Sequence, residues 1–222
     1  MSPYKPSYKA LILLAILIVP SIAYLLVSSG KNNYNKLEIF GPKEPVLSHP
    51  GDTIYHSIAP FSLIAQDGSD FSDKNLEGKL FVADFFFATC QTICPKMSMQ
   101  MKRIQEAYKD DSEIVLVSHT VNPEKDTVNA LAAYAESFGA IKGKWVFLTG
   151  DKKELYDLAR YSYFLATMPG DGGPDDFIHS EKLVLVDKDK RIRGYYDGTD
   201  YADVNNLIDD IKVLKWEYAH NR

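Results

Sequence analysis

The chain carries only two cysteines, Cys90 and Cys94, which lie four residues apart just before Pro95. Two sulfurs at this spacing can form a disulfide or bind one metal ion if a loop brings them together, since residues four apart on one helix lie too far apart for a disulfide. Proline suits the first helical position and pushes the preceding residue out of the helical region, which predicts Cys94 as an N-cap and Cys90 in a loop. The positive helix start should then favour the thiolate of Cys94. Two inert buried thiols are the simpler alternative.

The metal chemistry open to this pair is limited by the number of ligands. A structural zinc site needs four, and the chain has no further cysteine and no second Cys/His pair. Two thiolates and one imidazole suit copper, as Cu(I) or Cu(II). His179 is the preferred third ligand because it follows the Gly/Pro/Asp-rich loop 168–176 and leads into a strand, and His119, which ends another strand, is the second choice. Three further histidines are expected to lie outside the site: His49, His56 and His220.

A carboxylate, Asp84, interrupts an apolar run of strand length at 80–87, six residues before Cys90. A buried aspartate is costly unless it is hydrogen-bonded or protonated. Asp84 is therefore interpreted as a proton acceptor for thiol exchange or as a charge that tunes the cysteines, with a purely structural carboxylate as the alternative. The thioethers of Met97, Met99 and Met101 could bind Cu(I), but packing in the core is the preferred interpretation.

The elements that must position these groups alternate along the chain. Strands are predicted at 80–87, 114–118 and 144–148, and helices at 95–108, 124–138, 151–161 and 200–218. One hairpin is predicted around Asp67-Gly68, and a second pairs 182–186 with 192–196. This alternation predicts an α/β sheet with helices on both sides, to which the last hairpin adds an antiparallel part.

The N-terminal region differs from the rest of the chain. Residues 10–27 carry no charge and would reach about 27 Å as a helix, close to the thickness of a bilayer core. An uncleaved transmembrane anchor is preferred over a cleaved signal, whose apolar region is shorter and ends at a small-residue site. The predicted organisation is a cytoplasmic tail (1–9), an anchor (10–28), a linker or arm (29–59) and a folded domain (60–222). The flanking lysines are balanced, so they leave the orientation undecided.

Composition and charge exclude several classes of protein. With 45% hydrophobic residues and two cysteines, the 222 residues form neither a disordered nor a disulfide-stapled protein. Without its first 29 residues the chain keeps 23 basic and 30 acidic side chains. This acidic balance argues against nucleic acid as a partner, because phosphate binding requires a basic face.

Four sequence segments together resemble the Sco/SenC family of membrane-anchored, thioredoxin-like proteins. They are FFATCQTICP around the cysteines, VNPEKDT at 121–127, DFIHSEKLVLVD at 176–187 and GYYDG at 194–198. The resemblance covers roughly residues 55–220. One departure is Asn122, where the family more often has an acidic residue before the proline, and it leaves His119 as an extra histidine near the site.

The resemblance implies a thioredoxin-like fold with an N-terminal hairpin extension, and copper binding by Cys90, Cys94 and His179. It places Asp84 where thioredoxins carry a buried carboxylate. It also implies delivery of copper to, or thiol reduction of, the dinuclear copper centre of cytochrome c oxidase, with subunit II or a similar copper-site client as partner. The expected location is the inner (cytoplasmic) membrane, crossed once, with the domain in the periplasm or an equivalent compartment.

Two other functions use the same cysteines and stay open. One is a membrane-anchored thiol-disulfide oxidoreductase that works without metal, and the other is a redox or copper sensor that signals through a partner. A peroxidase is disfavoured because its reactive cysteine needs a supporting arginine, and no arginine precedes Arg103.

Overall fold

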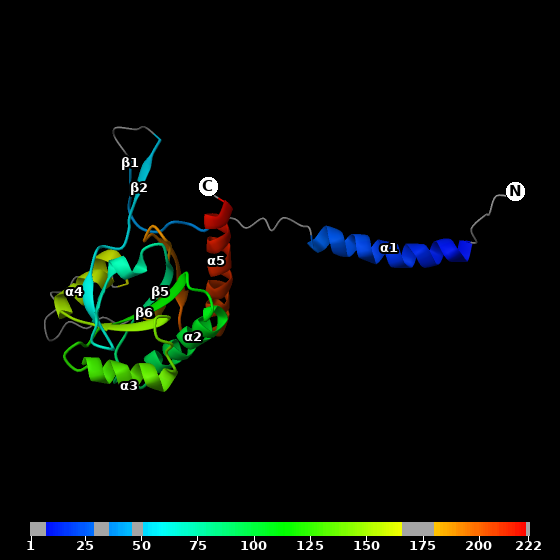
Figure 1. Ribbon diagram of the computed structural model, residues 1–222. Helices are drawn as coiled ribbons and strands as arrows, with labels where there is room; N and C mark the ends of the chain where they lie inside the picture. The colour runs from blue at the N-terminus through cyan, green and yellow to red at the C-terminus, as the bar shows by residue number, and fades with distance from the viewer. Residues whose placement is uncertain (1–7, 29–35, 46–50, 166–179, 221–222) are drawn as a thin grey trace, which may run out of the picture. The chain divides into compact units, whose positions relative to one another are not determined.

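The computed structural model describes residues 8–28, 36–45, 51–165 and 180–220 (Figure 1). The chain divides into two compact units, residues 1–35 and 36–222. The first contains helix α1 (Tyr8–Ser28), which includes Pro20. Within the part of the chain that the structure describes, no helix is long and apolar enough to cross a membrane. The anchor over residues 10–28 stays a prediction.

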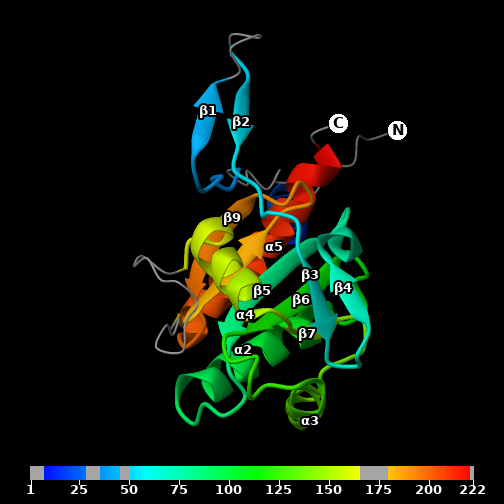
Figure 2. The same cartoon turned by 90° about the vertical axis from the view of Figure 1, so that its left-hand side faces the viewer.

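The second unit is built on a seven-stranded sheet with the order β4-β3-β7-β6-β5-β8-β9 (Figure 2). Strands β5, β6 and β7 are parallel, and the strands on either side of them are antiparallel to their neighbours. The predicted α/β architecture with a closing antiparallel hairpin is confirmed. The bounds are β3 (Ser62–Ala65), β4 (Asp70–Ser72), β5 (Leu80–Phe86), β6 (Ile114–Thr120), β7 (Trp145–Thr149), β8 (Lys182–Val186) and β9 (Ile192–Asp197).

Each face of the sheet has its own core, because side chains alternate along a strand. Leu80, Val82 and Phe86 of β5 pack against α2 (Ile93–Tyr108), α3 (Val128–Phe138) and α5 (Tyr201–His220). Phe81, Ala83 and Phe85 pack on the other face, against α4 (Lys152–Asp157) and the π-helical turn η2 (Leu158–Ser162). The 3-10 turn η1 (Asp73–Leu76) follows β4. Helices therefore cover both faces, as predicted.

Several helix limits differ from the predicted ones for local reasons. The helix predicted from residue 124 begins at Val128, because the Thr127 side chain accepts a hydrogen bond from the N–H of Ala130 as its N-cap. It ends as predicted at Gly139, which has a φ of 70°. The helix predicted over 151–161 is α-helical only to Asp157 and continues as the π-helical turn η2.

The N-terminal part of the second unit lies against the sheet and the last helix. Residues 37–40, called the strap below, run beside β9, where the N–H of Phe40 donates to the carbonyl of Ile192. The buried Arg193 guanidinium donates to the strap carbonyls at 37 and 38 and to the Glu217 carboxylate, which accepts the N–H of Leu37. A small antiparallel hairpin follows the strap, β1 (Lys43–Pro45) and β2 (Thr53–Tyr55).

Candidate metal centre

The two cysteines meet at the start of α2, just beyond the carboxyl end of β5. Both are free thiols, and the N–H of Cys94 lies 3.4 Å from the Sγ of Cys90. The Oγ1 of Thr92 lies 3.7 Å from the same sulfur. The predicted N-cap is wrong by two residues: Thr92 holds that position and α2 begins at Ile93, so Cys94 is already helical. The proline therefore marks the helix start closely, but the turn that gathers the sulfurs begins earlier than predicted.

The pKa values of the two thiols are shifted in opposite directions. Partial burial raises the pKa of Cys90, but hydrogen bonds from the backbone and side chains of Cys94 and Thr92 outweigh it and lower the pKa to about 7. Burial raises the pKa of Cys94 to about 12, and the neighbouring charges of Cys90 and Asp84 add to this effect. The expectation that the helix start would favour the thiolate of Cys94 is wrong, because the free N–H groups point at the sulfur of Cys90. Cys90 is thus the more acidic of the two thiols, and Cys94 keeps its proton at neutral pH.

Asp84 lies on the face of β5 that supports α2, and it is fully buried. The hydroxyl of Ser118 on β6 donates to its Oδ1 over 2.5 Å, and the Trp145 indole N–H donates to that hydroxyl over 2.9 Å. Burial raises the pKa of Asp84 to about 7, although the Ser118 hydrogen bond opposes the rise. The structure therefore brings the carboxyl predicted from the sequence close enough to Cys94 to affect its ionisation.

A second buried carboxylate, Asp126, supports the backbone that leads from β5 to the cysteines. Its Oδ2 accepts the Thr120 hydroxyl over 2.5 Å and the N–H of Ala88 over 3.1 Å. Its Oδ1 has no hydrogen-bond partner in the described part of the chain, and burial raises the pKa of this carboxyl. Sequence reasoning missed this residue as a support of the site, and the only signal for it was its place in the segment 121–127.

His119, the second choice as third ligand, lies on the wrong face of the sheet. It neighbours Ser118 on β6, so its ring points to the opposite core, where it stacks on Phe85 with the ring centres 4.8 Å apart. The hydroxyl of Tyr163 lies 3.4 Å from its Nε2, and burial lowers the pKa of His119 to about 3. The structure does not bring His119 to the cysteines, because adjacent strand residues point to opposite faces.

The remaining predicted site residues divide into described and undescribed ones. His179 and His49 lie outside the described residues. His56 contacts the carbonyl of Ser162 over 2.8 Å, and the His220 ring contacts the carbonyl of Trp216 over 2.9 Å, so neither belongs to the site, as expected. Among the described side chains, no group of three or more His, Cys, Asp or Glu residues is placed to hold a metal ion. The described chain thus brings two soft sulfur atoms together, and the ligand set of Cys90, Cys94 and His179 stays a prediction.

Of the three methionines that follow the cysteines, two pack in the core as predicted. Met97 and Met101 are fully buried under the sheet. Met99 is 56% exposed, so the core-packing interpretation is wrong for this residue. Its neighbours two positions away point inward, which turns Met99 to the outer side of α2.

Comparison with known proteins identifies the family to which this chain belongs. The family model of SCO1/SenC matches residues 52–215. The chain belongs to the SCO1/SenC family. It is 31% identical over 163 residues to the SCO1 protein homolog of Bacillus subtilis, covering 72% of this chain and 84% of that protein.

Solved structures of SCO1/SenC proteins share the fold. The structure of BsSco, described as having a disulfide switch and as a member of the Sco family of cytochrome c oxidase assembly proteins, is 30% identical, with a TM-score of 0.61 over 72% of this chain and 93% of that one. The copper-bound ScoI of Arabidopsis thaliana is 31% identical, with a TM-score of 0.57 over 71% of this chain and 98% of that one. The Sco-like, thioredoxin-type α/β fold is thereby confirmed.

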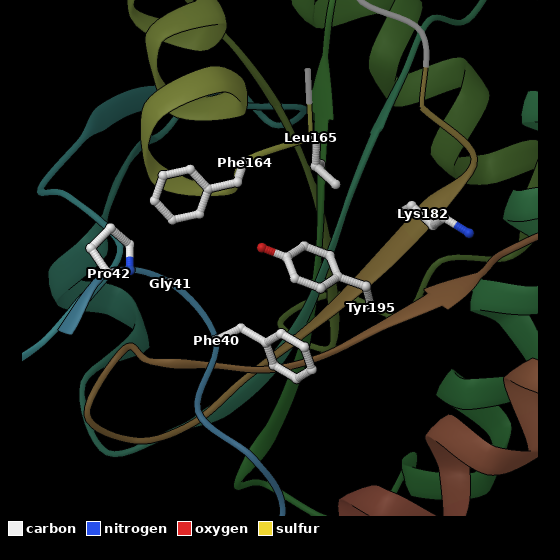
Figure 3. Close-up of a pocket in the computed structure, with 7 residues that line it drawn as sticks. All are labelled: Phe40, Gly41, Pro42, Phe164, Leu165, Lys182 and Tyr195. Atoms are coloured by element: carbon white, nitrogen blue, oxygen red, sulfur yellow. The ribbon is translucent and has the colours of Figure 1, made fainter. Parts of the chain in front are cut away.

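One sizeable pocket of this SCO1/SenC chain lies apart from the cysteines. The strap region, the end of η2 and strands β8 and β9 surround it, and the Tyr195 hydroxyl points into it between Phe164 and Pro42 (Figure 3). That hydroxyl donates to the carbonyl of Tyr163 over 3.0 Å. Neither cysteine lines this pocket, so it is separate from the candidate metal centre at the start of α2.

Proposed function

We propose that this chain binds copper through Cys90 and Cys94, with His179 as the third ligand, and acts in the assembly of cytochrome c oxidase. The observation that carries the proposal is the pair of sulfurs held at one helix start beside the buried carboxyl of Asp84. The copper bound to the Arabidopsis relative and the oxidase assembly role of the BsSco family support it. Residues 10–28 anchor the domain to the inner membrane, and the domain lies in the periplasm or an equivalent compartment.

The chain's own groups prepare the site for a soft metal ion. Copper accepts two thiolates and an imidazole as Cu(I) or Cu(II). Cys90 supplies one thiolate near neutral pH, while Cys94 must lose a proton that burial holds on its sulfur. Asp84 is the nearby base for that proton, and Ser118 orients it. The client is a copper site such as that of oxidase subunit II.

A second candidate, thiol reduction of the client, is favoured by the unequal pKa values of the two cysteines. The Cys90 thiolate attacks one sulfur of a client disulfide, and the first client thiolate leaves. Cys94 gives its proton to Asp84, its thiolate attacks Sγ of Cys90, and the second client thiolate leaves. Two electrons pass to the client, and a Cys90–Cys94 disulfide remains.

Oxidase activity in cells that carry single variants separates the two functions. Copper delivery requires an imidazole that thiol exchange does not need, so His179→Ala should impair the oxidase nearly as fully as Cys90→Ser. His220→Ala, which changes a histidine outside the site, is the matched control. Normal oxidase activity with His179→Ala, together with its loss in Asp84→Asn at equal protein level, would overturn the copper-delivery proposal in favour of thiol reduction.

A further inference from the structure

The exposure of the two thiols determines where a partner must contact this domain. Cys94 is only 3% exposed, whereas Cys90 is half-buried and Thr92 beside it is exposed. A partner that exchanges a ligand or a bond with Cys90 therefore approaches the N-terminal end of α2. A partner close enough to react with Cys90 must also contact the outer side of the first turns of α2.

The outer side of α2 differs in charge from the chain as a whole. Lys96, Met99 and Arg103 share it, because residues three, four and seven apart lie on one face of a helix. Lys96 is exposed, and neither Lys96 nor Arg103 forms an ion pair in the described part of the chain. The chain carries a net charge of −5, so this face is a local basic surface beside the thiols.

The start of α5 extends the surface, since α2 and α5 lie side by side (Figure 1). The ring of Tyr201, 61% exposed, lies 3.6 Å from the Arg103 guanidinium carbon, which fixes both side chains. Asn205 accepts a hydrogen bond from the same guanidinium. Tyrosine, methionine and arginine are among the residues enriched at protein interfaces, and a fixed side chain loses less entropy on binding.

The acidic side chains around this surface do not neutralise it. Glu106, the first acid along α2, lies 3.9 Å from Lys109. Asp200, which precedes α5, accepts the N–H of Ala202, and Asp203 on α5 accepts the N–H of Asp197 at the end of β9. In the described part of the chain, none of these three carboxylates forms an ion pair with Lys96 or Arg103.

We infer that Lys96, Met99, Arg103 and Tyr201, called the α2 face, form the docking surface for an acidic protein that presents its own dithiol site. This inference rests on the proposed function, because it names the kind of partner that meets Cys90. A dithiolate within carboxylate side chains is complementary in charge to the α2 face. Such complementarity accelerates encounter and selects the partner more than it adds affinity.

Thiol exchange with two synthetic peptides tests the inference on the full-length chain in a neutral detergent. Both peptides carry two cysteines, flanked by glutamates in one and by lysines in the other. A peptide thiolate attacks Cys90 of the oxidised chain and releases the Cys94 thiolate, which takes up a proton. The second peptide thiol then closes the peptide disulfide and reduces Cys90. The quantity measured is the ratio of the acidic to the basic peptide's rate, because the intrinsic reactivity of each peptide cancels between variants.

At low ionic strength, Lys96→Glu and Arg103→Gln should each lower this ratio about threefold or more, and added salt should remove the difference. Lys74→Glu is the matched control: this exposed lysine follows β4, four strands away from β5, and it should leave the ratio unchanged. An equal effect of the control, or no effect of either α2 variant, overturns the inference.

A second measurement does not depend on the thiols. Peptides with serine in place of cysteine are titrated into the chain, and the backbone amide shifts are followed by NMR. The acidic peptide should shift the amides of the α2 face, and the basic peptide should not. Shifts centred elsewhere reject the docking surface even if the cysteines bind copper. Failure of dithiothreitol to reduce the oxidised chain rejects thiol exchange and leaves the docking result standing.

Discussion

The N–H of Cys94 donates to the sulfur of Cys90 over 3.4 Å, so the helix start stabilises negative charge on the outer sulfur of the pair. The sulfur of Cys94, in the same turn, is buried and lies near negative charges, and both effects raise its pKa. One short segment therefore holds a thiol that ionises near neutral pH and a second thiol that keeps its proton.

The first prediction concerns the order of thiol reactivity. Alkylation by iodoacetamide should modify Cys90 with a half-maximal rate near pH 7, because only the thiolate reacts and the pKa of Cys90 is lowered to about 7. Cys94 should stay unmodified below pH 9. Mass spectrometry of the digested chain locates the label, and Cys90→Ser serves as the control. Modification of Cys94 before Cys90 would contradict the assignment.

The second prediction concerns the ligands of copper. Cys90→Ser and Cys94→Ser should each abolish tight binding in a titration of the reduced chain, because no other cysteine can replace the lost thiolate. His179→Ala should weaken binding and change the Cu(II) spectrum. His119→Gln should keep the wild-type spectrum, since this ring faces the opposite core. Exchange of the last two results would identify His119 as the ligand.

The third prediction uses the protonation of Asp84. The folded chain holds this proton up to about pH 7, while an unfolded aspartate releases it near its ordinary pKa of 3.8. The folded state thus binds more protons, and this group lowers the free energy of unfolding as pH rises from about 4 to 7. Asp84→Asn should remove that loss and stabilise the chain at pH 7.5 by a few kcal/mol, since one pKa unit corresponds to about 1.4 kcal/mol.

Urea unfolding at pH 5 and pH 7.5 measures this effect. His119 acts in the opposite direction over part of the range, because its pKa is lowered to about 3, so only the difference between wild type and variant isolates Asp84. The exposed Asp209→Asn is the control and should leave the profile unchanged. An equal pH dependence in wild type and Asp84→Asn would show that Asp84 is ionised throughout.

The fourth prediction concerns the strap. Arg193→Met leaves the buried carboxylate of Glu217 without its cation and leaves Asp187 paired with Arg191 alone. Breaking such a buried pair costs about 3–5 kcal/mol. Lys212→Met removes an exposed pair with Asp209 and should cost less than about 1 kcal/mol. The midpoint of urea unfolding compares the two variants. Equal small losses would mean that the strap contributes little to stability.

Much of the fold was predictable because apolar periodicity reflects burial directly. The run that became β5 is buried along its whole length, and the closing hairpin has the predicted strands. The start of α3 was less predictable, since it depends on which side chain caps the helix, and the change of α4 into a π-helical turn after Asp157 has no signal in the apolar pattern. Because Thr127 caps the helix, α3 begins four residues later than the sequence pattern indicated.

In the site, the spacing to Pro95 and the interruption at Asp84 predicted which residues come together. These two features did not predict which sulfur ionises, because that depends on where individual N–H groups point. The face of His119 depends on the register that pairs Asp84 with Ser118, which no local pattern encodes. Asp126 was missed for the same reason: only the fold brings its carboxylate to the N–H of Ala88.

The strap has a consequence for the behaviour of many copies at one surface. A free sheet edge invites pairing with another chain, and proteins avoid this with covered or very short edge strands. The edge at β9 is covered at its start, since Phe40 of the strap donates its N–H group to the carbonyl of Ile192, and Ile58 donates to the carbonyl of Lys190 in the turn before β9. The opposite edge strand, β4, has only three residues and begins with the exposed Asp70. Neighbouring copies can therefore be crowded together without joining their sheets into an aggregate.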